Sequence, residues 1–272
     1  MLGAGVNRGL PTASGLYRVR RSDSTEIVYI GQTGKGLRDR LRMLSGTYAT
    51  EMPYNDPHTA APALWALRRS ENVEFDVSVV QLSGNKQSIV GEECVAITMH
   101  RRKSGSSPAF NFGGMPPGYR KSSSNNRRLV DQRKRFRGGA DADAPVTPAS
   151  IAPLLDPTGD VVGTSWCSLL WSDWCAADDR NAPVKVNGLY RLRRRGSSDL
   201  LYIGQGVIAR RVLSHCGKAD FRVVAPGRTL EVSWVATPKL VTRQRLEWEN
   251  DLIASHVLSR GATPRLQFGG TG

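Results

Sequence analysis

The sequence has little of what several common classes of protein require. Its four cysteines, Cys94, Cys167, Cys175 and Cys216, include no CxxC pair, so a zinc site is not expected. Buried free thiols in a reducing compartment are the better interpretation. No apolar run approaches the roughly 20 residues of a membrane-spanning helix, and Met1 to Ala13 lacks the features of a signal peptide. We therefore expect a cytoplasmic protein with no membrane partner.

Acidic residues are also scarce relative to basic ones. The 272 residues include 38 Lys and Arg against 24 Asp and Glu, a net charge of +14. A surplus of this size attracts polyanions, of which nucleic acid is the usual one, although a solvated basic surface with no dedicated partner remains the alternative. Met115 to Arg137 alone carries eight basic residues and one acidic residue. This stretch is either a phosphate-binding arm or a disordered linker, and the two interpretations are compatible.

The most informative feature that is present is a repeated pair of triplets. A Gly-Leu-Tyr triplet is followed by a Tyr-Ile-Gly triplet, and the two tyrosines are twelve residues apart in both copies. The four triplets are Gly15-Leu16-Tyr17, Tyr29-Ile30-Gly31, Gly188-Leu189-Tyr190 and Tyr202-Ile203-Gly204. Identical spacing indicates an internal duplication. The chain is long enough for two domains of about 100 to 130 residues each.

The hydrophobic pattern predicts the same order of elements in both copies: a strand hairpin, a helix, a third strand and a final helix. In the first copy these are strands 14–21 and 26–30, a helix from Leu37, a further helix 63–69, strand 74–82 and helix 87–101. In the second they are strands 189–192 and 200–203, a helix near 208–213, strand 230–235 and helix 243–258. Gly31, which ends the second triplet of the first copy, is expected to break its strand.

These elements predict four regions. Residues 1–114 form the first copy, 115–163 a basic and flexible connector, 164–185 a helix packing on the second domain, and 186–272 the second copy. The helix is expected because five apolar residues, three of them tryptophans, form a stripe between 164 and 177. Core packing is the expected role of these tryptophans, with base stacking as the alternative.

A second sequence spacing is the same in both copies. Glu93 precedes Asn111 by eighteen residues, Glu249 precedes Gln267 by eighteen, and Phe-Gly-Gly follows in both copies. This register selects Glu93 over Glu92 and Glu249 over Glu247, and the two rejected glutamates are expected on solvated helix faces.

Each copy therefore offers two tyrosines on a hairpin, an arginine on the next helix and a glutamate on a later one. One carboxylate is too few for a two-metal centre but suffices to hold one hydrated Mg²⁺. Arginine suits a phosphate oxygen, and a tyrosine beside a cation could take a proton from water, although its ordinary pKa is near 10. The set fits metal-assisted phosphodiester hydrolysis. The alternative for the tyrosines is simple packing within a sheet.

These residues resemble the GIY-YIG nuclease superfamily. The resemblance implies an α+β fold with two tandem domains, each a small three-stranded antiparallel sheet flanked by helices. It implies that Tyr17 and Tyr190 are general bases, that Tyr29 and Tyr202 lie near the nucleophile or phosphate, and that Arg40 and Arg211 stabilise the phosphate. Glu93 and Glu249 would each bind one Mg²⁺ or Mn²⁺, and Asn111 would brace its site.

The copies depart from the family pattern in different ways. His215 matches a histidine that many members carry after the arginine, but a surface histidine is the alternative, and Leu44 stands at this position in the first copy. In the second copy, Gln267 stands at the position that Asn111 occupies in the first.

The function expected from the resemblance is a DNA endonuclease that cuts both strands of a duplex with two sites in one chain, as in restriction or defence. A monomer is compatible with the duplication, but the sequence leaves the oligomeric state open and does not separate DNA from RNA. The alternatives are a nucleic-acid-binding protein or a nickase in which one or both copies are inactive.

Overall fold

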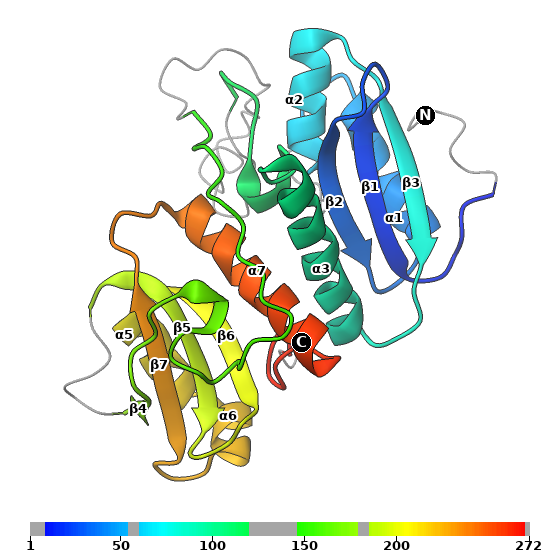
Figure 1. Cartoon of the computed structure of the whole chain (residues 1–272). Coiled ribbons are helices and arrows are strands. Elements are labelled where there is room, and N and C mark those ends of the chain that lie inside the picture. The colour runs from blue at the N-terminus through cyan, green and yellow to red at the C-terminus, as the bar shows by residue number, and fades with distance from the viewer. Residues whose placement is uncertain (1–8, 54–59, 120–145, 179–184, 270–272) are drawn as a thin grey trace, which may run out of the picture. The chain divides into compact units, whose positions relative to one another are not determined.

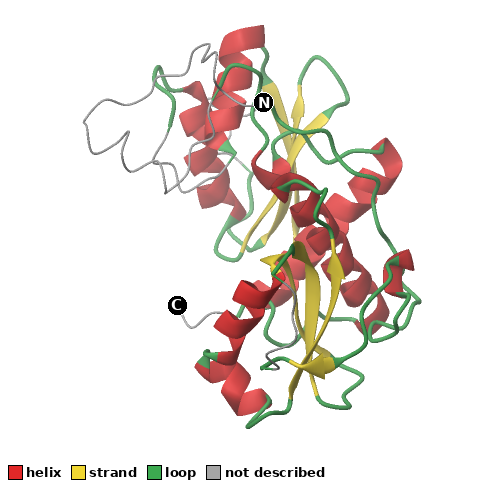
Figure 2. Cartoon of the chain, turned by 90° about the vertical axis from the view of Figure 1, so that its left-hand side faces the viewer, coloured by secondary structure: helices red, strands yellow, loops and turns green. Residues whose placement is uncertain are grey.

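The computed structural model describes residues 9–53, 60–119, 146–178 and 185–269. This part of the chain is an α+β structure with two small antiparallel sheets and six α-helices (Figures 1 and 2). It divides into two compact units, Met1–Asn85 with Ser107–Ala149 and Lys86–Ser106 with Ser150–Gly272. None of the described helices has both the length and the apolar character needed to cross a membrane. Most of the basic stretch from Met115 to Arg137 lies outside the described residues.

The first unit is built on three strands in the order β2-β1-β3. Its elements are β1 (Gly15–Arg21), β2 (Ile27–Thr33), α1 (Leu37–Met43), η1 (Leu44–Tyr48), α2 (Ala61–Glu71) and β3 (Phe75–Gln81). Val19, Leu41, Leu64 and Phe75 are central to its apolar core. The expected hairpin, third strand and first two helices are therefore present in this unit, whereas the expected helix 87–101 corresponds to α3 (Lys86–Ser104) and belongs to the second unit.

The second unit repeats this order as β6-β5-β7 and adds one short strand, β4, beside β7. Its elements are α3 (Lys86–Ser104), η3 (Trp166–Ser168), β4 (Cys175–Ala176), β5 (Asn187–Arg194), β6 (Leu200–Val207), α5 (Ile208–Cys216), α6 (Ala219–Val224), β7 (Leu230–Ala236) and α7 (Thr242–Arg260). The expectation of a three-stranded second sheet is therefore wrong by this one strand, which pairs Cys175 with Val232.

The hairpins of the two units match residue by residue. Tyr17 is opposite Gly31 and Tyr190 is opposite Gly204. The register of each hairpin shifts at the equivalent place, after Val19 in the first unit and after Leu192 in the second. The internal duplication predicted from the sequence is thus visible in the strand pairing itself.

The glycines of the triplets are required by close contacts. A side-chain Cβ at Gly31 would lie 2.5 Å from Tyr17 Oη, and one at Gly204 would lie 2.4 Å from Tyr190 Oη. A Cβ at Gly188 would lie 2.2 Å from the carbonyl oxygen of Val235. The expectation that Gly31 breaks its strand is wrong, since β2 continues past it, just as β6 continues past Gly204. These glycines make room for the tyrosine rings.

The segment 164–177 is not the expected helix. It contains only the short turn η3 and the strand β4. Cys167 and Ser168 have φ angles of 55° and 57°, in the left-handed region that interrupts a helix.

The tryptophans of this segment instead cover a buried cation. The Arg191 guanidinium carbon lies 4.2 Å from the centre of the Trp171 ring and 4.9 Å from that of Trp174. Arg191 is fully buried and donates hydrogen bonds to the carbonyls of residues 161–163 and to Ser233 Oγ. The tryptophans therefore pack, as expected, but on an extended backbone whose carbonyls solvate an arginine.

Helices α3 and α7 pack against each other with a symmetry that the duplication explains. Glu93 and Glu249 are 156 positions apart, and three contacts map onto one another under this offset. They are Asn250 Nδ2 with Cys94 O, Arg101 with Glu247, and Gly91 with Val257. Contacts that interchange in this way are typical of two related surfaces meeting about a two-fold axis. The offset supports the pairing of Glu93 with Glu249 as equivalent positions.

Candidate active site in the second repeat

The second unit brings together the predicted side chains of the second copy. Tyr190 comes from β5, Tyr202 from β6, Arg211 and His215 from α5, and Glu249 from α7. The rings of Tyr190 and Tyr202 lie 6.1 Å apart, and the rings of Tyr202 and His215 lie 4.4 Å apart. Tyr190 Oη is 3.0 Å from His215 Nε2. His215 is buried in the site, so the alternative of a surface histidine is wrong.

Local sequence explains this convergence. Helix α5 begins directly after β6, and its buried residues Ile208, Val212 and His215 are spaced i, i+4 and i+7. This spacing turns the imidazole toward the sheet, while Arg211, one turn earlier on the same side, stays exposed enough to meet a ligand.

Burial sets the proton affinities of the aromatic groups. Burial raises the pKa of Tyr190 and of Tyr202 above the ordinary value, although the charge of Arg211 acts on both in the opposite direction. Burial lowers the pKa of His215 to about 4, assisted by the charges of Lys218 and Arg211. Both phenols are therefore protonated near pH 7, and the imidazole is neutral. A neutral Nε2 can accept the Tyr190 proton when Nδ1 carries the ring proton.

Glu249 is the half-buried carboxylate of the site. Burial raises its pKa to about 7, with Arg211 acting in the opposite direction. In the part of the chain that the structure describes, no hydrogen bond or ion pair is found for this carboxylate. Partly desolvated and unpaired carboxylate oxygens are suitable ligands for a hard divalent cation.

The site fits a cation with few protein ligands. Among the described residues, no group of three or more His, Cys, Asp or Glu side chains is arranged to hold a metal ion. A cation at Glu249 would therefore keep most of its water and would share phosphate oxygens of the substrate, as Mg²⁺ commonly does.

The neighbouring glutamates differ from each other. Glu92 is exposed, as expected. The expectation that Glu247 lies on a solvated face is wrong, because it is fully buried and ion-paired with Arg101 and Arg243. Its partner Arg101 is nearly 150 residues earlier in the chain, too far for a local pattern to indicate.

The first repeat has a related but incomplete arrangement. The rings of Tyr17 and Tyr29 lie 6.1 Å apart, and both are buried. The Arg40 Nε atom is buried without a hydrogen-bond partner in the described structure. Leu44, at the position of His215, is fully buried in the apolar core.

Glu93 lies on α3 and is half-buried. This helix belongs to the second unit, whereas the other predicted residues of the first site, Asn111 included, belong to the first. The role of Glu93 in the first site stays a prediction.

The two side-chain amides near the ends of the repeats make equivalent hydrogen bonds to the backbone. Asn111 Oδ1 accepts a hydrogen bond from the Ile30 N–H at 3.0 Å, and its Nδ2 donates to the Ile30 carbonyl at 2.8 Å. Gln267 Oε1 accepts from the Ile203 N–H at 2.9 Å. Each amide thus holds the strand between the second tyrosine and its glycine. The longer side chain of Gln267 reaches the equivalent group, which the sequence comparison did not foresee.

Comparison with known proteins gives no match with a family model, a curated protein or a solved structure.

Proposed function

We propose that the chain is a divalent-metal-dependent DNA endonuclease with two tandem GIY-YIG-type domains, and that the second repeat forms a working phosphodiesterase site. One observation carries the proposal. A buried phenol lies 3.0 Å from a neutral imidazole, beside an exposed arginine and an unpaired carboxylate whose pKa is raised to about 7. These are the groups that hydrolysis of a phosphodiester needs.

Each side chain has a stated role in hydrolysis. Glu249 would hold Mg²⁺ or Mn²⁺, which when bound would neutralise charge on the phosphate and favour deprotonation of water. Water oxygen forms a bond to phosphorus, the bond from phosphorus to the departing sugar oxygen breaks, and that sugar oxygen takes up a proton from solvent water. The water proton passes to Tyr190 Oη while the phenol proton moves to His215 Nε2, so the tyrosine never has to ionise in its buried position. Arg211 stabilises the charge that develops on the phosphate oxygens.

Two features of the chain support DNA as the substrate. The net charge of +14 favours a polyanion. Two copies of the site fold offer two cuts, which cleavage of both strands of a duplex requires. A role in restriction or defence against foreign DNA follows as the biological setting of such an enzyme.

A nickase is the second candidate, and one observation favours it. Leu44 occupies the position of His215 and is sealed in the core of the first unit. A first repeat without an imidazole lacks the proton acceptor that serves Tyr190, so the second repeat would cut one strand while the first grips DNA.

Cleavage of supercoiled plasmid in Mg²⁺ or Mn²⁺ tests the proposal. Wild-type protein and the Glu92→Gln control are expected to cut, and Glu249→Gln is expected to abolish cutting by the second repeat. If wild type gives linear product and Glu93→Gln or Glu249→Gln gives nicked circles, both repeats are active. If wild type gives only nicked circles and Glu249→Gln gives none, the protein is a nickase. A gel shift of DNA without cleavage in any of these metals refutes the nuclease and favours a nucleic-acid-binding protein.

A further inference from the structure

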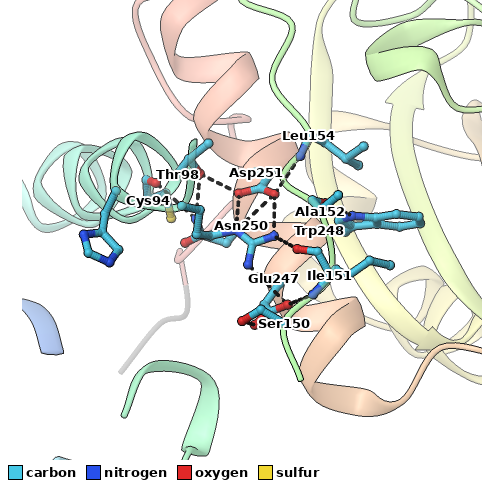
Figure 3. A network of polar contacts seen from close by, with 12 residues as sticks. Cys94, Thr98, Ser150, Ile151, Ala152, Leu154, Glu247, Trp248, Asn250 and Asp251 are labelled. Atoms are coloured by element: carbon cyan, nitrogen blue, oxygen red, sulfur yellow. Dashed lines mark hydrogen bonds and ion pairs between the residues drawn. The ribbon is translucent and has the colours of Figure 1, made fainter. Parts of the chain in front are cut away.

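A buried polar network surrounds Glu249 on α7 without including it. Glu247 and Asp251, two residues before and two residues after it, are both fully buried. One side chain of α3 bridges them. Arg101 places Nη1 3.2 Å from Glu247 Oε2 and Nε 3.1 Å from Asp251 Oδ1 (Figure 3). The guanidinium fork thus spans one full turn of α7, and Glu249 lies at the middle of that turn.

Further hydrogen bonds fasten the same face of the helix. Asp251 accepts from Thr98 Oγ1 at 2.8 Å and from the Leu154 N–H at 2.9 Å. Glu247 accepts from Ser150 Oγ at 2.8 Å and from the Ile151 N–H at 2.9 Å. Residues 150–154, which were expected to belong to a flexible connector, are therefore held against α7.

Helical geometry shows which face of α7 this network holds. Residues i and i+4 share a face of a helix, so Glu247 and Asp251 face α3 and the 150–154 segment together. Successive residues are rotated by about 100°, which puts Glu249 about 200° from its two neighbours. The network therefore holds one face of α7, and the Glu249 carboxylate, whose charge acts on Arg211 and on both tyrosines, projects from the other.

Such a network is poor evidence for stability alone. Apolar side chains of similar volume often hold two helices together as well as a buried ion pair does. Apolar contacts, however, allow a helix to rotate or slide by small amounts, whereas a guanidinium fork on two carboxylates fixes the angle and the axial position of α7.

We propose that Arg101 is a positioning residue for the second-repeat site. By holding Glu247 and Asp251, it fixes the rotation of α7 and so the place at which Glu249 meets a divalent cation. The proposal rests on the proposed function of Glu249 as the metal ligand.

The test compares variants of the full chain for the Mg²⁺ concentration that gives half-maximal plasmid cleavage, for the rate at saturating Mg²⁺, and for thermal stability. In Arg101→Met/Asp251→Asn one charge of each sign is removed, and the asparagine oxygen still accepts from Leu154. Loss of groups that orient a metal ligand commonly costs 10- to 100-fold in metal affinity. We expect the half-saturating Mg²⁺ to rise by about 10-fold or more, with a smaller change in the saturated rate.

The matched control removes an ion pair of the same unit that does not touch α7. Arg193 and Glu231 pair at 2.9 Å between β5 and β7, and Arg193→Met/Glu231→Gln is expected to leave the Mg²⁺ dependence unchanged. A folded Arg101→Met/Asp251→Asn protein with the wild-type Mg²⁺ dependence overturns the proposal. If that variant fails to fold, Arg101→Lys decides, because a lysine keeps the charge but cannot bridge both carboxylates. Wild-type Mg²⁺ dependence in Arg101→Lys then also overturns it.

Failure of the positioning role is distinguishable from failure of the nuclease. If wild type cuts and Glu249→Gln does not, yet the Arg101 variants match wild type, only the positioning role is lost. If wild type does not cut DNA in Mg²⁺ or Mn²⁺, the nuclease proposal fails and the positioning role fails with it.

Discussion

Replacing Glu249 by glutamine should stabilise the metal-free protein at alkaline pH. Burial raises the pKa of Glu249 from 4.5 to about 7, so the folded chain holds a proton that the unfolded chain releases between these values. Stability therefore falls as the pH rises from about 4.5 through 7. The full cost above pH 7 is about 3 kcal/mol, since each unit of pKa corresponds to about 1.4 kcal/mol. A neutral glutamine does not incur this cost.

Thermal unfolding of the metal-free protein measures the effect. A gain of about 3 kcal/mol corresponds to an increase in Tm of roughly 6 to 12 °C for a protein of this size. Glu249→Gln should show this increase at pH 8 and almost none at pH 4, where the carboxyl is protonated in both states. The same substitution at the exposed Glu92 should leave Tm unchanged at both values. A Tm at pH 8 equal to that of wild type, or an equal gain at pH 4 and pH 8, would refute the reasoning about burial.

Added Mg²⁺ should stabilise wild type but not Glu249→Gln. A cation bound at Glu249 stabilises the folded state of wild type by mass action and replaces the solvation that the carboxylate has lost. Millimolar Mg²⁺ should therefore raise the Tm of wild type at pH 8 and leave that of Glu249→Gln unchanged. A similar rise in both proteins would show that the cation binds elsewhere.

Three other substitutions test separate parts of the structure. His215→Leu, which copies Leu44 of the first repeat, should reduce cleavage by the second repeat by about 10²- to 10⁴-fold, the usual range for a proton acceptor; single-turnover rates check this, and an unchanged rate contradicts the proton path. Gly204→Ala should displace the Tyr190 ring and lower cleavage while the circular dichroism spectrum is retained; full activity would show that the close approach is not needed. Arg191→Met should change tryptophan fluorescence and leave the carbonyls of residues 161–163 without donors, which should lower the free energy of unfolding in denaturant by about a few kcal/mol; an unchanged midpoint would contradict the packing of the tryptophans around Arg191.

The hairpin and its tyrosines could be predicted because local rules determine them. A separation of twelve positions brings both tyrosines onto one face of a two-stranded ribbon, and α5 follows with its apolar spacing intact. The break expected at Gly31 is wrong because a glycine within a strand commonly marks an interruption of it. The reason for a glycine at this position is the tyrosine ring of the neighbouring strand, and this contact appears only once the strands are paired.

Non-local contacts account for the other errors. The tryptophan-rich segment has a helix-like spacing, but its side chains are drawn toward the guanidinium of Arg191 on β5. Glu247 looks like a surface residue until α3 supplies Arg101. In both places a buried arginine that is distant in the sequence decides the local structure, and no pattern within a short window contains that information.

The most direct test of the central claim is the position of Mn²⁺ in crystals of the protein with a DNA duplex, measured by anomalous scattering. We expect a peak at bonding distance from the Glu249 carboxylate and from a phosphate oxygen, with the Tyr190 hydroxyl and Arg211 facing the same phosphate. Mn²⁺ bound away from Glu249, or DNA bound with no phosphate in this site, would contradict it.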